Sequence, residues 1–198
     1  MGSKENILKA ALRVFLEKGY DAASINDVVR ESKFTKGGLY HHFPNKEHLF
    51  IETINFLFEE FERWENEIYS QEMSLKEILQ IYFASMSEMI NFIKEVAETD
   101  KLEESNFYNL MFDAFHRFPE IKEKHNQTHK KNEEAFIRVL IDAQKKKIIQ
   151  DDIDPRTFAF MVNALVEGTM SYHLINEKID LKEMGEKLFQ NVWNSIKI

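Results

Sequence analysis

Residues 24–43 read SINDVVRESKFTKGGLYHHF, and the spacing of this stretch predicts the organisation of the N-terminal region. Ser24 and Asp27, three residues apart, form a capping box that opens a short helix. Thr35 caps a second short helix, which must end before Pro44 because the residue before a proline is pushed toward extended backbone. Two short helices joined by a turn of about three residues have the size and spacing of a helix-turn-helix.

Gly37 and Gly38 stand in the first turn of the second helix, where each glycine costs about 1 kcal/mol relative to alanine. Without side chains, they leave the free backbone N–H groups at the positive end of the helix open to phosphates or base edges. Hydrogen-bond donors surround this surface at Lys36, Tyr40, His41 and His42. A flexible turn is the less favoured alternative, so the pattern predicts a DNA-facing helix.

Helix-breaking residues are scarce along the whole chain, with six Gly and three Pro among 198 residues. Average usage would supply about 12% of these two types, and a sheet protein needs a turn signal about every ten residues. Apolar periodicity and capping residues therefore predict an all-α fold of about nine helices, with Gly19 ending the first. The expected helices span residues 4–18, 25–32, 36–42, 46–71, 75–98, 103–118, 119–147, 155–175 and 181–198.

Composition excludes several classes of protein. A hydrophobic content of 43% with 17 Phe is enough for a sizeable core, which excludes a disordered chain. No apolar run approaches the roughly 20 residues that span a bilayer, so we expect a soluble protein with no membrane partner. The absence of cysteine excludes disulfide scaffolds, thiolate metal sites and cysteine nucleophiles. The N-terminus lacks the apolar run of a signal peptide, and we expect a cytoplasmic protein.

The formal net charge of −8 taken alone argues against a nucleic-acid partner. Residues 1–50, however, hold eight Lys and Arg against six Asp and Glu, a balance of +2, while the remaining 148 residues carry −10. Such an asymmetry indicates a nucleic-acid-facing end on an acidic body. The acidic body is expected to repel DNA elsewhere and to limit nonspecific binding.

Six segments near the N-terminus carry a resemblance to a known family: ILKAA at 7–11, LRVF at 12–15, GY at 19–20, SINDVV at 24–29, TKGGLYHHF at 35–43 and NKEHL at 45–49. Together they cover nearly all of residues 4–50 and resemble the DNA-binding domain of the tetracycline-repressor (TetR) family, most of all that of its multidrug-responsive members. Beyond residue 50 only the length and the helical pattern match. The resemblance implies a DNA-binding domain over residues 1–46 and a helical effector-binding and dimerisation domain over residues 47–198.

The turn of the motif departs from the family pattern. The family usually has a small residue, a glycine and an apolar residue there, whereas this chain has Ser32-Lys33-Phe34. Lys33 is therefore expected to adopt a conformation that glycine favours, at a modest cost. Phe34 can still supply the apolar anchor.

The resemblance implies a ligand-responsive transcriptional repressor. Such a protein binds a near-palindromic operator in double-stranded DNA as a homodimer and is released by a small lipophilic effector; activation is the alternative, because the motif does not encode the sign of regulation. The implied DNA contacts are phosphates for Ser24, Thr35 and Lys46, base edges for Lys36 and Gly37, the DNA backbone for Tyr40 and His42, and a variable, base-reading position for His41. Outside this context, Lys36 and Lys46 would be solvated surface charges and Tyr40 a core residue.

Aromatic and methionine side chains are concentrated between residues 56 and 136. A stripe at helical spacing is more often core than pocket, yet these side chains also line cavities for lipophilic effectors. The candidate ligand-binding residues are Trp64, Tyr82, Met86, Met89, Phe107, Met111 and Phe136. Polar candidates are Glu88 or Glu133 for a cationic ligand, and Asn163 or His129 for a hydrogen bond.

The last two expected helices carry broad apolar faces interrupted by Gly168 and Gly185. A glycine inside a helix is costly, and it often marks a close approach between helices. The resemblance implies that these helices form a four-helix dimer interface, and a monomeric core pair is the alternative. The candidate dimer residues are Phe158, Val162, Leu165, Val166, Thr169, Leu188 and Val192.

Two rival functions come from other classes. A helical ligand carrier without DNA binding has no reason to keep the costly glycine pair at 37–38. A metal-dependent sensor or enzyme would use His125 and His129, which lie four residues apart on one expected helix. No third ligand and no catalytic constellation accompanies them, so we expect no cofactor, no metal and no enzymatic activity.

Overall fold

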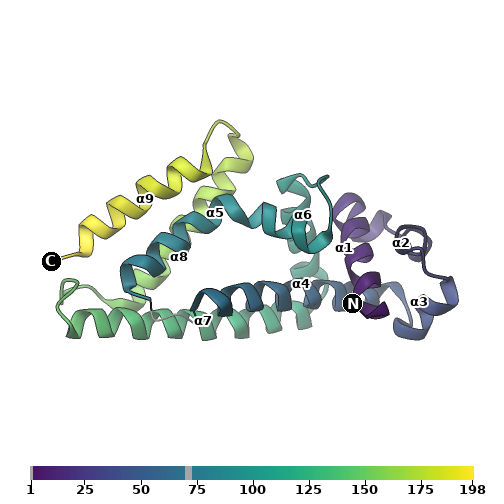
Figure 1. The fold of residues 1–198 in the computed structure, drawn as a ribbon, viewed down its shortest axis with the longest axis horizontal. Coiled ribbons are helices and arrows are strands. Elements are labelled where there is room, and N and C mark those ends of the chain that lie inside the picture. Colours follow the sequence, from purple (N-terminus) through teal and green to yellow (C-terminus); the bar gives the residue numbers. More distant parts are fainter. Residues whose placement is uncertain (1, 70–72) are drawn as a thin grey trace. The chain divides into compact units, whose positions relative to one another are not determined.

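The computed structural model describes residues 2–69 and 73–198, apart from the side chains of residues 65 and 67–69. Within these ranges the chain forms nine helices and no strand beyond one isolated bridge, which confirms the all-α prediction (Figure 1). None of the described helices combines the length and apolarity needed to cross a lipid bilayer. The helices are α1 (Ser3–Ala22), α2 (Ile25–Ser32), α3 (Lys36–His42), α4 (Lys46–Tyr69), α5 (Leu75–Ala97), α6 (Glu104–Arg117), α7 (Pro119–Lys145), α8 (Pro155–Ile175) and α9 (Leu181–Ile196).

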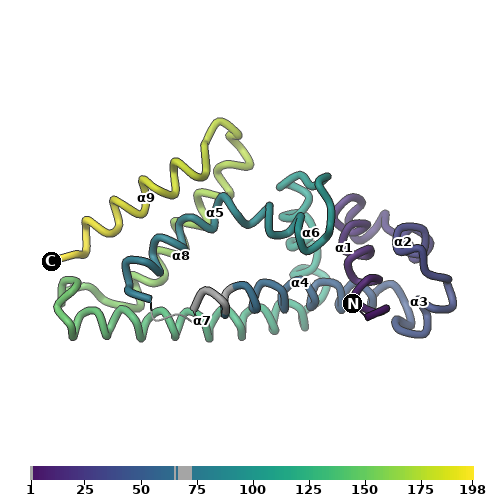
Figure 2. Tube along the Cα trace, viewed as in Figure 1, coloured from purple at the N-terminus to yellow at the C-terminus, as the bar shows by residue number. Residues whose placement is uncertain are grey.

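The chain divides into two compact units. Unit 1 combines Met1–Ile68 with Ile90–Asn126, and unit 2 combines Tyr69–Met89 with Gln127–Ile198. The expected DNA-binding domain, residues 1–46, lies wholly within unit 1, where α1, α2 and α3 gather beside the start of α4 (Figure 2). The boundary predicted at residue 46 stays a prediction, and the predicted end of the fourth helix at residue 71 lies outside the described residues.

The apolar face of α1 packs into the core of unit 1, with buried side chains at three- and four-residue spacing from Ile7 to Leu16. Gly19 interrupts the helix with φ +71° and ψ 174°, a backbone conformation that residues other than glycine rarely adopt. The chain then makes one further turn to Ala22. The predicted stop at Gly19 is therefore a kink inside a longer helix.

Helix α9 approaches α5 closely within unit 2 at Gly185. A Cβ atom placed there would stand 2.4 Å from the carbonyl oxygen of Phe83 and 3.2 Å from Cε of Met86. This agrees with the predicted close approach at Gly185. At Gly168, by contrast, a Cβ atom would meet nothing within 4 Å, so no part of the described chain explains that glycine.

Gly185→Ala is expected to lower the free energy of unfolding by about 1–3 kcal/mol, because the added methyl group overlaps the Phe83 carbonyl. Urea denaturation followed by circular dichroism measures the change. Gly37→Ala is the matched control, since that helical position has open space and gains up to about 1 kcal/mol from alanine. Equal stability of the two variants would contradict the packing of α9 on α5.

Candidate nucleic-acid interface

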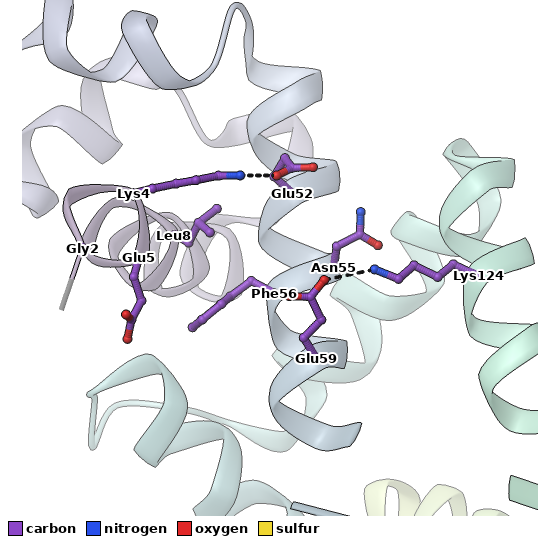
Figure 3. A pocket seen from close by; sticks show the side chains of 9 residues that line it. All are labelled: Gly2, Lys4, Glu5, Leu8, Glu52, Asn55, Phe56, Glu59 and Lys124. Atoms are coloured by element: carbon purple, nitrogen blue, oxygen red, sulfur yellow. Dashed lines mark hydrogen bonds and ion pairs between the residues drawn. The ribbon is translucent and has the colours of Figure 1, made fainter. Parts of the chain in front are cut away.

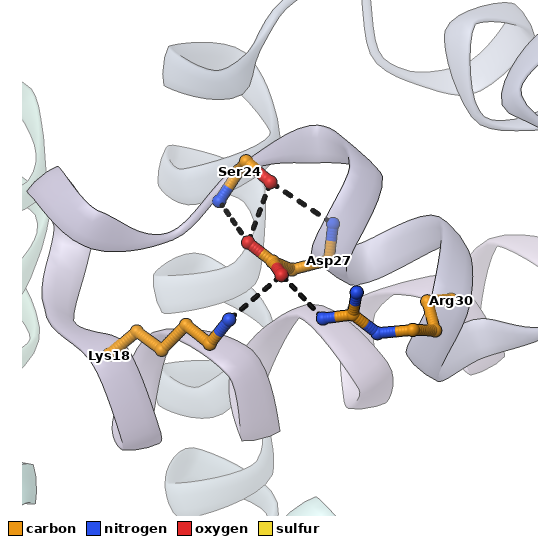
Figure 4. Close-up of polar contacts among 4 residues, drawn as sticks. All are labelled: Lys18, Ser24, Asp27 and Arg30. Carbon is orange, nitrogen blue, oxygen red and sulfur yellow. Dashed lines mark hydrogen bonds and ion pairs between the residues drawn. The ribbon is translucent and has the colours of Figure 1, made fainter.

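Helix α2 begins with the predicted capping box, centred on Asp27 (Figure 4). The Ser24 backbone N–H and hydroxyl both donate to Oδ2 of Asp27, at 3.0 and 2.6 Å, and the Asp27 N–H donates back to Ser24 Oγ at 3.2 Å. Lys18 and Arg30 donate to the other carboxylate oxygen at 2.8 and 2.6 Å. Because Lys18 belongs to α1, the Asp27 carboxylate joins the end of α1 to the start of α2. The Asp27 side chain is only 15% exposed.

These contacts lower the pKa of Asp27 and engage the Ser24 hydroxyl in a hydrogen bond within the motif. The hydrogen bond from Lys18, followed by those from Ser24, holds the pKa of the Asp27 carboxyl well below its usual range. The single hydroxyl proton of Ser24 goes to Asp27, so the predicted phosphate contact from this hydroxyl would require that bond to break. The bonds from Lys18 and Arg30 were not anticipated from the sequence.

The turn between α2 and α3 has the expected left-handed residue. Lys33 has φ 59° and ψ 15°, the conformation for which glycine is preferred, and this costs roughly 1–2 kcal/mol for other residues. Phe34 follows it and is half-buried. The turn thus keeps its geometry without the usual glycine.

The two glycines of α3 have different roles. The Thr35 hydroxyl caps the helix by accepting from the Gly38 N–H at 3.1 Å, and a Cβ atom at Gly38 would press on that oxygen at 3.2 Å. Gly38 therefore makes room for the cap, a role that the sequence pattern does not indicate. A Cβ atom at Gly37 would meet nothing within 4 Å, so Gly37 leaves the start of the helix bare, as predicted.

The remaining side chains of α3 divide between the core and the surface. Leu39 and Phe43 are fully buried and anchor the helix. Tyr40 is 45% exposed, which excludes the core alternative for this ring. His42 is half-buried, with Nε2 3.3 Å from the Ser3 hydroxyl. The exposed members of the predicted set are Ser24, Thr35, Lys36, Gly37, Tyr40 and His41, whereas Lys46 is half-buried.

Basic side chains in the first 46 residues differ in their partners. Carboxylates at 2.6–2.9 Å pair with Lys4, Lys9, Arg13, Lys18 and Arg30. Lys36 and Lys46 lie against neutral groups instead. Lys36 Nζ is 6.0 Å from the centre of the Tyr40 ring, whereas Lys46 Nζ donates to the Asp21 carbonyl oxygen at 3.1 Å. These contacts do not cancel the charge of the two ammonium groups.

Comparison with known proteins agrees with this geometry. Residues 7–53 match the family described as bacterial regulatory proteins, tetR family. The chain is 30% identical to the HTH-type transcriptional regulator QacR of Staphylococcus aureus over 131 residues, which cover 59% of this chain and 68% of QacR. The chain belongs to the TetR family. It is a DNA-binding transcriptional regulator, which confirms the resemblance drawn from the N-terminal motifs.

Two further relatives extend the comparison. IcaR of Staphylococcus epidermidis, a negative transcriptional regulator of a biofilm operon, is 33% identical over 58 residues, which cover 29% of this chain and 31% of IcaR. A TetR-family regulator from Cytophaga hutchinsonii superposes with a TM-score of 0.76 at 19% identity, covering 98% of this chain and 94% of the other. The TetR likeness therefore extends in fold beyond the DNA-binding motif.

The candidate ligand-binding residues of this TetR-family chain divide between the units. Unit 2 contains a stacked pair, Tyr82 and Phe136, with ring centres 5.6 Å apart. Met86 is 1% exposed and lies beside Gly185, which agrees with the core interpretation for this side chain. Unit 1 holds Trp64, Phe107 and Met111, and unit 2 also holds Met89 and the polar candidates Glu88, His129, Glu133 and Asn163.

A surface hollow of about 400 Å³ lies in unit 1 among the start of α1, α4 and α7 (Figure 3). Two ion pairs border it, Lys4–Glu52 at 2.7 Å and Lys124–Glu59 at 3.3 Å. None of the candidate ligand-binding residues lines it. This hollow is therefore distinct from the predicted effector site.

The candidate dimer residues lie mostly in the core. Leu165, Thr169 and Leu188 are half-buried, and the four that are buried are Phe158, Val162, Val166 and Val192. The exposed apolar side chains of α8 lie on a different side of the helix, at Phe160 (69% exposed), Met161, Tyr172 and Ile175 (82%), with Gly168 among them. The candidate residues of α8 therefore lie on the side that packs within the chain, and apolar periodicity alone does not tell which partner covers an apolar stripe. A dimer surface on α8 stays a prediction for the exposed side.

One histidine of the metal alternative, His125, lies in aromatic packing contacts. The His125 ring is 5.1 Å from the ring of Phe58 and 4.9 Å from that of Phe115, centre to centre. Among the side chains that the structure describes, no group of three or more His, Asp or Glu could hold a metal ion.

The lowered pKa of Asp27 predicts part of the acid sensitivity of the fold. A carboxyl whose pKa is lower in the folded state stabilises the protein above its unfolded pKa of about 3.9, and this contribution is lost as the pH falls below that value. Asp27→Asn is therefore expected to be less stable at neutral pH and to lose less of its remaining stability between about pH 5 and pH 3. Urea denaturation at a series of pH values measures both effects.

Asp152→Asn, in an exposed loop, is the control and should keep the wild-type pH dependence. A slope for Asp27→Asn as steep as that of the wild type would contradict the role of this carboxylate.

Proposed function

We propose that the protein is a ligand-responsive repressor that binds a near-palindromic operator as a homodimer through α3. The observation that carries this proposal is the contrast among its N-terminal cations. Most are neutralised by carboxylates, while Lys36 and Lys46 lie against a ring and a carbonyl and keep their charge for an external anion. DNA phosphate is such an anion, and direct lysine contacts account for much of the affinity of DNA-binding proteins.

The surface of α3 supports major-groove contact. Its first turn is bare at Gly37, and Lys36, Tyr40 and His41 are exposed around it. Lysine at the N-terminal end of a recognition helix can read the acceptor atoms of guanine, while Tyr40 can donate to a phosphate. Two such helices in a dimer would enter successive major grooves, with half-sites about 34–36 Å apart.

Repression and effector release complete the proposal. IcaR is a negative regulator, and a dimer bound across a promoter blocks transcription by occupancy. A lipophilic effector that binds the helical body more tightly in one conformation would shift the population away from the operator-binding form. The stacked Tyr82 and Phe136 rings in unit 2 are aromatic side chains of the kind that line such effector sites, although Phe136 is only 5% exposed in this structure. Because bacterial operators lie in the cytoplasm, we place the protein there.

Lys36→Ala is expected to weaken binding to a 30-base-pair duplex selected by the wild-type protein from a random pool. If Lys36 contacts a phosphate, its removal reduces the slope of log affinity against log salt concentration by about one per subunit, and hence by about two in a dimer. A lysine that contacts only base edges instead relaxes sequence preference with little change in slope. Fluorescence anisotropy at several salt concentrations separates the two cases.

Arg138→Ala removes an exposed cation of unit 2 and serves as the control, with wild-type affinity expected. Unchanged affinity, salt slope and sequence preference for Lys36→Ala would contradict the DNA-contacting role of α3. Repeating the titration with lipophilic cations and with acyl compounds tests the effector. If no member of either class weakens wild-type binding, the lipophilic-effector part of the proposal is wrong.

The exposed side of α8 is the surface that we propose for the homodimer. Phe160, Tyr172 and Ile175 are largely exposed large apolar side chains on one helix, which is unusual for a surface without a partner. Gly168 lies among them with open space around it, so the helix of a second copy could approach closely there.

Phe160→Glu is expected to convert the dimer into a monomer at micromolar concentration, because a carboxylate would be buried between two apolar faces. Sedimentation velocity measures the change in mass. Phe112→Glu is a matched control, since Phe112 is 70% exposed on α6 in unit 1 and lies outside the proposed interface. A dimer that persists in Phe160→Glu, or that is lost equally in Phe112→Glu, would contradict this surface.

A further inference from the structure

Asp21, in the last turn of α1, contacts two cations from other helices of unit 1. Its backbone carbonyl accepts a hydrogen bond from Lys46 at the start of α4, at 3.1 Å. Its carboxylate accepts two from Arg117 at the end of α6, with Nη1–Oδ1 at 2.9 Å and Nη2–Oδ2 at 2.5 Å. Asp21 thus joins a predicted phosphate-binding lysine to the guanidinium of Arg117, which is 96 positions from Asp21 in the sequence.

The neighbouring Tyr20 ring holds the same two cations. Lys46 Nζ is 4.5 Å and Arg117 Cζ 5.5 Å from its centre, within the range of cation–π attraction. The ring itself is fixed by edge contacts with Phe50 at 4.8 Å and Phe118 at 5.2 Å. The ends of α1 and α6 and the start of α4 are therefore packed around one aromatic cluster.

The choice of partner decides what Lys46 can do. A neutral carbonyl oxygen orients the ammonium group and uses one of its three protons, which leaves its charge and further donors for a phosphate. The Asp21 carboxylate belongs to the same residue, and it would be the stronger partner for Lys46 if it were available. The paired, charge-assisted bonds from Arg117 occupy that carboxylate.

We propose that Arg117 is a positioning residue for operator binding, because it holds the Asp21 carboxylate away from Lys46 and so keeps that ammonium group available to a DNA phosphate. This inference rests on the proposed operator binding and adds a residue that does not itself touch DNA. A displacement of the end of α6 that separates Arg117 from Asp21 would let the carboxylate pair with Lys46. Each subunit would then lose one phosphate contact, so the ion pair couples α6 to the DNA-binding surface.

The exposure of the pair separates this role from a structural one. The Asp21 side chain is 71% exposed and that of Arg117 is 36% exposed, and exposed ion pairs contribute little to folding stability. Loss of Arg117 should therefore change operator affinity while the thermal unfolding midpoint stays close to that of the wild type.

The test uses the full chain and the 30-base-pair duplex selected by the wild-type protein. Arg117→Ala is expected to weaken binding and to reduce the salt slope by about one per subunit, and hence by about two in the dimer. Asp21→Asn in the same chain should restore wild-type affinity and slope, although Arg117 is still missing, because the competing carboxylate is gone. Asp21→Asn alone should bind at least as tightly as the wild type, and Arg138→Ala is the charge control.

A second comparison uses the Lys46→Ala background, where removal of Arg117 should have no further effect on slope or affinity. Wild-type binding by Arg117→Ala, or a double variant with Asp21→Asn that stays as weak as Arg117→Ala, overturns the inference. So does an equal loss on removing Arg117 with and without Lys46. Failure of the wild-type protein to select or bind any duplex would instead refute the proposed function itself.

Discussion

The Asp27 carboxylate is the interaction on which the DNA-binding surface depends. It joins Lys18 near the end of α1 to the first turn of α2, and the cap that it forms with Ser24 fixes where α2 begins. The position of α3 follows from that start, because α2 is only eight residues long and the left-handed Lys33 sets the turn. Four donors stabilise the ionised form of the Asp27 side chain, and its protonation would weaken these hydrogen bonds. The geometry of the motif is therefore linked to pH through the pKa of this one group.

The scarce glycines show where this helical chain requires bare backbone. At Gly185 the requirement is internal, since the carbonyl of Phe83 occupies the place of a side chain. At Gly37 it is external, because nothing within the chain fills the space. Both glycines lie inside helices and carry a similar cost in helix stability. Only contacts distant in sequence show that Gly185 makes room for another helix of the chain and that Gly37 does not. Gly168 resembles Gly37 in this respect, and for this reason we propose that it faces the second copy of the chain in the homodimer.

Local features of the fold could be predicted from the sequence, whereas features set by distant contacts could not. Helix α3 begins and ends at the predicted residues because Thr35 and Pro44 act within one turn. The left-handed Lys33 followed from its place in the motif. The sequence does not tell the core side of α8 from its exposed side, because both carry large apolar residues and the periodicity is the same for a core and for an interface. The Arg117–Asp21 pair joins residues 96 positions apart, so no local sequence pattern predicts it.

An acidic protein that binds DNA must keep a few cations from its own carboxylates. Five of the N-terminal cations fail this condition because a carboxylate lies within 3 Å of each, and their charge serves the fold. Lys36 meets it because its neighbour at i+4 is Tyr40, whose ring attracts the ammonium group without neutralising it. Lys46 meets it although Asp21 is adjacent, because Arg117 occupies that carboxylate with two hydrogen bonds. The availability of Lys46 therefore depends on α6, whereas that of Lys36 depends only on its own helix, so a shift of the end of α6 would change the DNA contact of Lys46 and leave that of Lys36 in place.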